Sequence, residues 1–129
     1  MSSRAVRTLA RTWANTLSVP YIDTINFDTS PTDPIWFTIE FNSYGTDKLS
    51  FCQDWQEVGF IQLDFFGLAG VGDDGLLAAA EPAVKQFFQK VDPAGKITLT
   101  SLSAPDDFTP TGGAPKFGVS FIIDYEYQF

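Results

Sequence analysis

The sequence has few of the side chains that usually carry out chemistry in proteins. Its 129 residues include no histidine, the commonest general base and a frequent metal ligand. The single cysteine, Cys52, falls in a predicted strand, where a small buried apolar group is expected rather than a nucleophile. No arrangement of a nucleophile and a base is evident, and we expect neither enzyme activity nor a cofactor.

Two aspartate pairs and one glycine-rich segment are the remaining candidates for a binding site. Asp73 and Asp74, and likewise Asp106 and Asp107, lie in polar loops without the spacing of an EF-hand calcium site. Helix capping and solubility explain these pairs better, so we expect no metal. Residues 70–75 superficially resemble a dinucleotide-binding turn, but the acids would repel a pyrophosphate and no parallel sheet is evident.

The C-terminal segment predicts one of the elements that must position these residues. From Phe117 to Phe129 every odd-numbered residue is apolar, which places seven apolar side chains on one face of a strand. The opposite face is mostly polar. A strand of this kind requires a covering layer, and a composition with 13 phenylalanines favours a sheet.

Two amphipathic helices can supply that layer. Residues 3–17 place apolar side chains at helical spacing, and Pro20 would stop this helix. A second helix follows the glycine-rich segment, with Asp73 or Asp74 as its cap. The interior proline, Pro82, predicts either a kink or a helix that begins near Glu81.

The other segments are predicted to be strands and turns. We expect strands over 21–27, 35–42, 48–52, 57–68 and 96–102, a turn at 43–47, and a long loop over 103–115. Consecutive strands with short connections are antiparallel. The sequence therefore predicts a single α+β domain over residues 1–129, with a mainly antiparallel β-sheet covered on one face by two helices.

Charge is distributed unevenly along the chain. Arg4, Arg7 and Arg11 carry the only charged side chains before Asp23, and they recur at helical spacing. Residues 23–129 contain five lysines against 16 acids, a net charge of −11. Such an acidic body repels nucleic acid and membrane surfaces. The three arginines form either a solvated face or a basic stripe that meets an acidic surface.

Three stretches, taken with the order of the elements, resemble the small tail terminator (tail completion) proteins of long-tailed bacteriophages. They are residues 32–39, 57–66 and 70–75. Similar proteins have a Pro-Trp pair before a strand, a glycine-led strand after a hairpin, and a glycine-rich loop into a helix that ends in phenylalanine. Here Ile35 separates the proline from the tryptophan. The resemblance covers nearly the whole chain and rests on structural rather than catalytic motifs.

The resemblance implies a structural virion protein, located at the head-proximal end of the tail and assembled in the host cytoplasm. Such proteins form a ring, usually a hexamer, on the completed tail tube, where they end tube polymerisation and form the head–tail joining interface. Their partners are further copies of themselves, the tail tube protein and a head-completion or connector protein. DNA passes through the lumen without specific binding, and no membrane is involved.

Three regions are expected to make these contacts. The subunit interface is assigned to Arg4, Arg7, Arg11, Asp124 and Glu126. Contact with the tube or head is assigned to a loop whose one aromatic residue is expected to be exposed: Asp106, Asp107, Phe108, Thr109, Gly112 and Gly113. The lumen or a neighbouring subunit would face Asp73 and Asp74. An ordinary surface loop is the alternative for residues 106–113.

Two other functions fit the sequence. A tail tube or head–tail connector subunit shares the predicted fold, and a tube protein would form long polymers in isolation. A carbohydrate-binding module would use exposed aromatic side chains, for which Trp55, in a predicted turn at 53–56, is the best candidate.

Overall fold

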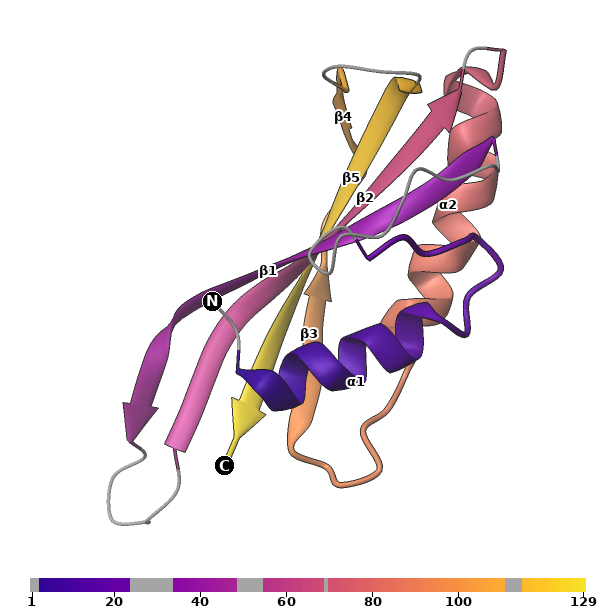
Figure 1. The fold of residues 1–129 in the computed structure, drawn as a ribbon. Coiled ribbons are helices and arrows are strands. Elements are labelled where there is room, and N and C mark those ends of the chain that lie inside the picture. The colour runs from indigo at the N-terminus through magenta and orange to yellow at the C-terminus, as the bar shows by residue number, and fades with distance from the viewer. Residues whose placement is uncertain (1–2, 24–33, 49–54, 69, 111–114) are drawn as a thin grey trace.

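A computed structural model describes residues 3–23, 34–48, 55–68, 70–110 and 115–129. The elements follow the order α1 (Arg4–Ala14), β1 (Ile35–Lys48), β2 (Trp55–Leu68), α2 (Gly72–Phe88), β3 (Ile97–Leu102), β4 (Asp106–Phe108) and β5 (Pro115–Gln128). The strands form one antiparallel sheet in the order β1-β2-β5-β3, and β4 also pairs with β5. Figure 1 shows β4 beside the beginning of β5 and β3 beside its end. The predicted α+β fold with an antiparallel sheet is confirmed.

The alternation in β5 separates a helix-covered face of the sheet from an open one. Val119, Phe121, Ile123 and Tyr125 are buried in one apolar cluster with side chains of both helices. Within that cluster the ring of Trp13 from α1 meets the ring of Phe87 from α2 edge-on, with 5.8 Å between their centroids. The hydrophobic effect therefore holds both helices on the same face.

A buried carboxylate fixes the beginning of α1 to the sheet. The side chain of Glu57, in β2, is 4% exposed and accepts a hydrogen bond of 2.6 Å from the hydroxyl of Tyr125. Its two carboxylate oxygens also lie 3.2 and 3.3 Å from the backbone nitrogen of Ser3, the N-cap residue of α1. A negative charge is favourable there because the helix dipole is positive at its N-terminus. Gly59 leaves the necessary space, since a Cβ atom would collide with the backbone oxygen of Asn42 and the Tyr125 hydroxyl.

Helix α2 begins well before Pro82, which contradicts one of the two expectations for this residue. It is helical from Gly72 to Phe88 with Pro82 in its interior, so a start near Glu81 is wrong. Proline lacks the N–H that would bond to the carbonyl of Ala78. Both residues are exposed, which lets water satisfy that carbonyl.

The predicted cap of α2 is also wrong. The N-cap residue is Val71, whose own side chain makes no capping hydrogen bond. Asp73 and Asp74 instead lie in the first turn, where the helix dipole favours carboxylates and the Asp73 carboxylate accepts a hydrogen bond of 2.8 Å from the N–H of Asp74. Helix α1 likewise ends at Ala14, three residues before the expected end.

The predicted turn at 43–47 is part of a strand. β1 continues through it to Lys48, and a β-bulge between Ser43 and Gly45 shifts its register against β2. Gly45 has a φ of 145°, which suits glycine, and its N–H donates to the hydroxyl of Ser43 at 3.2 Å. The strand predicted at 48–52 therefore has its first residue at the end of β1, and its other residues lie outside the described part of the chain.

Two more expectations about strands need correction. Within the described part of the predicted strand 21–27, the β-type contact is limited to an isolated parallel bridge between Tyr21 and Phe37, with the N–H of Ile22 donating to the carbonyl of Phe37 at 3.0 Å. Residues 24–27 lie outside the described residues. The predicted loop 103–115 contains β4, whose residues Asp106, Asp107 and Phe108 pair with β5.

Candidate functional site

The face of the sheet opposite the helices has an aromatic end. The register places Trp36, Phe66, Gly118 and Phe108 side by side across β1, β2, β5 and β4. The Trp36 and Phe66 rings stack with centroids 5.6 Å apart, and the Phe108 ring meets Phe66 edge-on at 5.5 Å. Phe108 lies over Gly118, where a Cβ atom would collide with the ring. The glycine thus lets β4 bring its aromatic side chain onto the open face.

Carboxylates occupy the neighbouring rows of this face. Asp64, in the middle of β2, is 7% exposed and accepts hydrogen bonds from Gln62 at 2.8 Å and from the hydroxyl of Ser120 at 2.5 Å. Glu40 lies across from Gln62 in the adjacent row. Partial burial of its carboxyl group raises the pKa of Glu40, and the negative charge of Asp64 raises it further. The Asp64 carboxylate is therefore close enough to oppose the ionisation of Glu40.

These side chains line a groove of about 590 Å³ between the sheet and the segment that contains β4. Hereafter it is called the open-face groove, and its principal side chains are Glu40, Asp64, Phe66, Asp106, Phe108 and Ile122. In the described part of the chain, no lysine or arginine lines it. The groove combines an aromatic end with an acidic wall, a combination that suits a cationic ligand with an apolar stem.

The predicted tube- or head-contact loop is partly built into this groove. Asp106 lines the groove, whereas the neighbouring Asp107 is exposed and does not line it. Thr109, also exposed, lies at the rim. Phe108 is half-buried against Phe66, so the expectation of an exposed aromatic is wrong: the open face of the sheet supplies an apolar partner. Gly112 and Gly113 lie outside the described residues.

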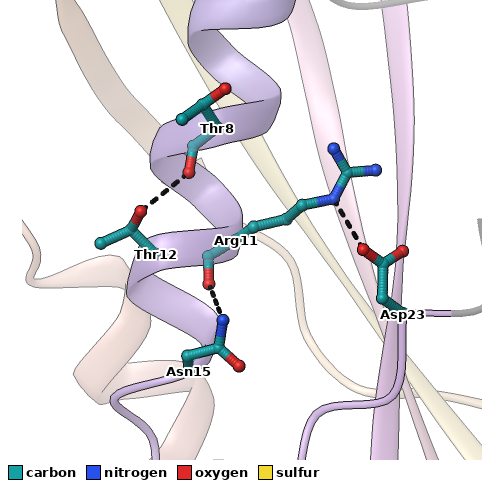
Figure 2. A network of polar contacts seen from close by, with 5 residues as sticks. All are labelled: Thr8, Arg11, Thr12, Asn15 and Asp23. Atoms are coloured by element: carbon teal, nitrogen blue, oxygen red, sulfur yellow. Dashed lines mark hydrogen bonds and ion pairs between the residues drawn. The ribbon is translucent and has the colours of Figure 1, made fainter. Parts of the chain in front are cut away.

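The basic stripe of α1 is largely engaged within its own chain. Figure 2 shows Arg11 reaching from the helix to Asp23, with 3.1 Å between its Nε and a carboxylate oxygen. The guanidinium groups of Arg7 and Arg11 also lie over the Phe41 ring, 5.1 and 5.5 Å from its centroid. Arg4 is exposed on the helix side of the molecule, where it lines a second hollow of about 610 Å³ between α1 and the loop before β3.

Asp92 organises the loop that borders this second hollow. Its carboxylate accepts hydrogen bonds of 3.0 Å from the backbone N–H groups of Ala94, Lys96 and Ile97. Burial alone would raise the pKa of Asp92, but these three donors and the positive charge of Lys96 outweigh it and lower the pKa. The carboxylate therefore holds the turn from α2 into β3.

The other predicted contact residues lie on separate surfaces. Asp124 is on the open face, where its carboxylate accepts a hydrogen bond of 2.5 Å from Ser101, and Glu126 follows on the same face of β5. Asp73 and Asp74 are exposed at the beginning of α2. The structure thus does not bring the predicted basic and acidic interface residues together within one chain.

Only one of the three tryptophans is positioned to meet a ligand. Trp13 and Trp36 are each 7% exposed, whereas Trp55 is 43% exposed. Trp55 begins β2 instead of lying in the predicted turn, and its backbone exchanges hydrogen bonds of 2.6 and 2.8 Å with Phe129. Its exposure agrees with the prediction, and the two hydrogen bonds tie its backbone to the C-terminal residue.

Sequence reasoning named only part of the open-face groove. Glu40, Asp64, Phe66 and Ile122 are not among the predicted site residues. The available signal was the acid Asp64 within an otherwise largely apolar strand, since a charged group in such a place requires polar partners.

Comparison with known proteins leaves the family open. No family model matches the sequence, and no curated protein matches it.

Among the described residues, no group of three or more His, Cys, Asp or Glu side chains is placed to hold a metal ion. The described helices also include none that is long and apolar enough to cross a membrane.

Proposed function

We propose that this protein is a structural subunit that assembles as a ring on the head-proximal end of a bacteriophage tail tube, where it ends tube polymerisation and joins the head. The starting point is the resemblance of residues 32–39, 57–66 and 70–75 to tail terminator proteins. The observation that supports it best is the one-sided sheet. Two helices cover one face, and the other face carries the open-face groove, which offers a surface for a neighbouring protein.

The separation of charges supports a head-to-tail contact between subunits. Arg4 and Lys96 border the hollow on the helix side, where Asp92 is the one acid among the described lining residues, while Asp124 and Glu126 lie on the opposite face. A surface that meets a different surface of the next copy closes into a ring when the rotation is suitable. The overall charge of −8 also suits a channel through which DNA passes without being gripped.

Solution mass measurement combined with negative-stain imaging tests this proposal. A closed ring of fixed stoichiometry with a central hole is the expected result. Arg4→Glu should weaken ring formation, whereas Lys85→Glu, which alters an exposed cation on α2, serves as the matched control. Long filaments would instead identify a tube subunit, and a protein that stays monomeric even with its tail tube present would exclude the terminator role.

A second experiment tests the biological role directly. In a phage that encodes this protein, removal of the gene should yield tails of uncontrolled length that do not join heads. Tails of normal length in its absence would refute the proposal, whatever the assembly state of the isolated protein.

A further inference from the structure

We propose that the open-face groove binds an arginine side chain presented by an extended segment of a different protein. The inference goes beyond ring formation and does not depend on it, because the groove is formed within a single chain. Its walls and floor come from β1, β2, β5 and the segment around β4, so the binding surface is fixed by the register of the sheet.

Charge complementarity calls for a cation. Glu40, Asp64 and Asp106 line the groove, and none of the described lining residues is a lysine or an arginine. The hydrogen-bond donors that reach Asp64 from Gln62 and Ser120 are neutral. Burial and the charge of Asp64 already oppose ionisation of Glu40 and raise its pKa. A cation between these carboxylates would relieve that repulsion.

The aromatic end of the groove favours arginine over lysine or a metal ion. Phe66 and Phe108 meet edge-on beside the acidic wall, and Ile122 adds an apolar surface. A guanidinium group stacks on aromatic rings and forms paired hydrogen bonds with carboxylates, while a lysine ammonium is a strongly hydrated point charge. The carboxylates in the described chain do not form a cluster that could hold a metal ion. The volume of about 590 Å³ accommodates the side chain with parts of its neighbours.

The arginines of the chain itself are poorly placed to fill this groove. Arg11 pairs with Asp23, and Arg7 lies over the ring of Phe41, both on the helix side. Arg4 is exposed but borders the second hollow. An arginine from a different protein is therefore the occupant that we infer, and Arg4 of a second copy is the rival that the experiment must exclude.

Fluorescence anisotropy with designed peptides tests the inference. The probe is a labelled nonapeptide with arginine at its centre, leucine two positions to either side, and serine elsewhere. Matched probes carry lysine, citrulline or glutamate at the centre. The arginine probe should bind about tenfold more tightly than the citrulline probe, which has the same shape without the charge. The lysine probe should bind more weakly than the arginine probe, and the glutamate probe should not bind.

Variants of exposed acids locate the binding. The double variant Glu40→Gln with Asp106→Asn should weaken the arginine probe about tenfold, because it removes two of the three carboxylates of the groove. Asp107→Asn is the matched control, since it removes the same charge from the adjacent residue, which does not line the groove. Its affinity should stay within about twofold of the parent protein. All three positions are exposed, so the fold should survive.

Three results would overturn the inference. Equal binding of the arginine and citrulline probes would exclude recognition of the charge. Equal losses in the Asp107→Asn and the double variant would place the effect outside the groove. Self-association that Arg4→Ala abolishes, and that the arginine probe displaces, would make a second copy the occupant. Normal ring formation with no arginine binding would refute this inference alone, while arginine binding by a protein that forms no ring would refute only the proposed function.

Discussion

Replacing Tyr125 with phenylalanine tests whether the buried carboxylate of Glu57 holds helix α1 on the sheet. Tyr125 is fully buried, and its hydroxyl donates to the carboxylate at 2.6 Å. The variant keeps the ring and removes this donor, leaving the longer contacts with the backbone N–H of Ser3. Hydrogen bonds to charged groups contribute about 1.5–3 kcal/mol. We therefore expect the free energy of unfolding to fall by about 2 kcal/mol.

Urea denaturation at neutral pH measures this loss. Tryptophan fluorescence is a suitable probe, because two of the three tryptophans, Trp13 and Trp36, are buried in the fold, and Trp13 lies on α1 against Phe87. In a thermal scan the same loss corresponds to a decrease in Tm of about 7 °C for a domain of this size. Tyr44→Phe is the matched control, since Tyr44 is 69% exposed. It should change the stability by less than about 0.5 kcal/mol.

A loss in Tyr125→Phe no larger than that of the control would refute the anchoring argument. A double-mutant cycle with Glu57→Gln sharpens the test, because the two substitutions weaken the same charge-assisted hydrogen bond: Tyr125→Phe removes its donor, and Glu57→Gln removes the charge of its acceptor. Their effects should be less than additive. Additive effects would mean that the two side chains stabilise the protein independently, in conflict with the short contact between them.

Three further predictions concern separate parts of the chain. Gly118→Ala should displace the Phe108 ring, which the added Cβ would meet, and so loosen β4; faster amide exchange in residues 106–108, with the exchange of β2 unchanged, is the expected result. Asp92→Asn should lower Tm at pH 7, because a lowered pKa means that the ionised carboxylate stabilises the fold above its unfolded pKa; the difference should disappear as the pH falls through the folded pKa. Glu40→Gln should raise Tm at pH 7, because a raised pKa means that ionisation disfavours the fold; this gain should vanish in acid, once Glu40 is protonated.

The regular elements were predictable because local pattern decides them. The alternation in residues 117–129 places each side chain of β5 on a face without reference to any other strand. The β-bulge between Ser43 and Gly45, found where a turn at 43–47 was expected, was not predictable in this way. Gly45 is as typical of a turn as of a bulge, and the choice depends on whether β2 continues to pair alongside it. β4 has three residues, too few to show a period.

The open-face groove depends on information that the sequence carries only indirectly. Glu40 and Asp64 are 24 positions apart, and Asp106 is a further 42 positions along the chain. They share the groove because the strand register places β1, β2, β5 and β4 side by side. A shift by one residue would move each of the β-strand side chains to the other face. Periodicity identifies the polar face of each strand but does not state which polar side chains meet.

Two acids of β2 show that the two faces of the sheet differ in whether the chain itself compensates a buried negative charge. Glu57 and Asp64 are seven positions apart, on opposite faces, and both are nearly buried. Glu57 receives its donors from Tyr125 and from the positive end of α1, so the chain itself stabilises that charge. In the described chain, the hydrogen bonds to Asp64 come only from neutral groups, and Glu40 lies beside it. A cation bound at the open face would therefore favour the folded state, and Tm should rise with the concentration of the arginine probe.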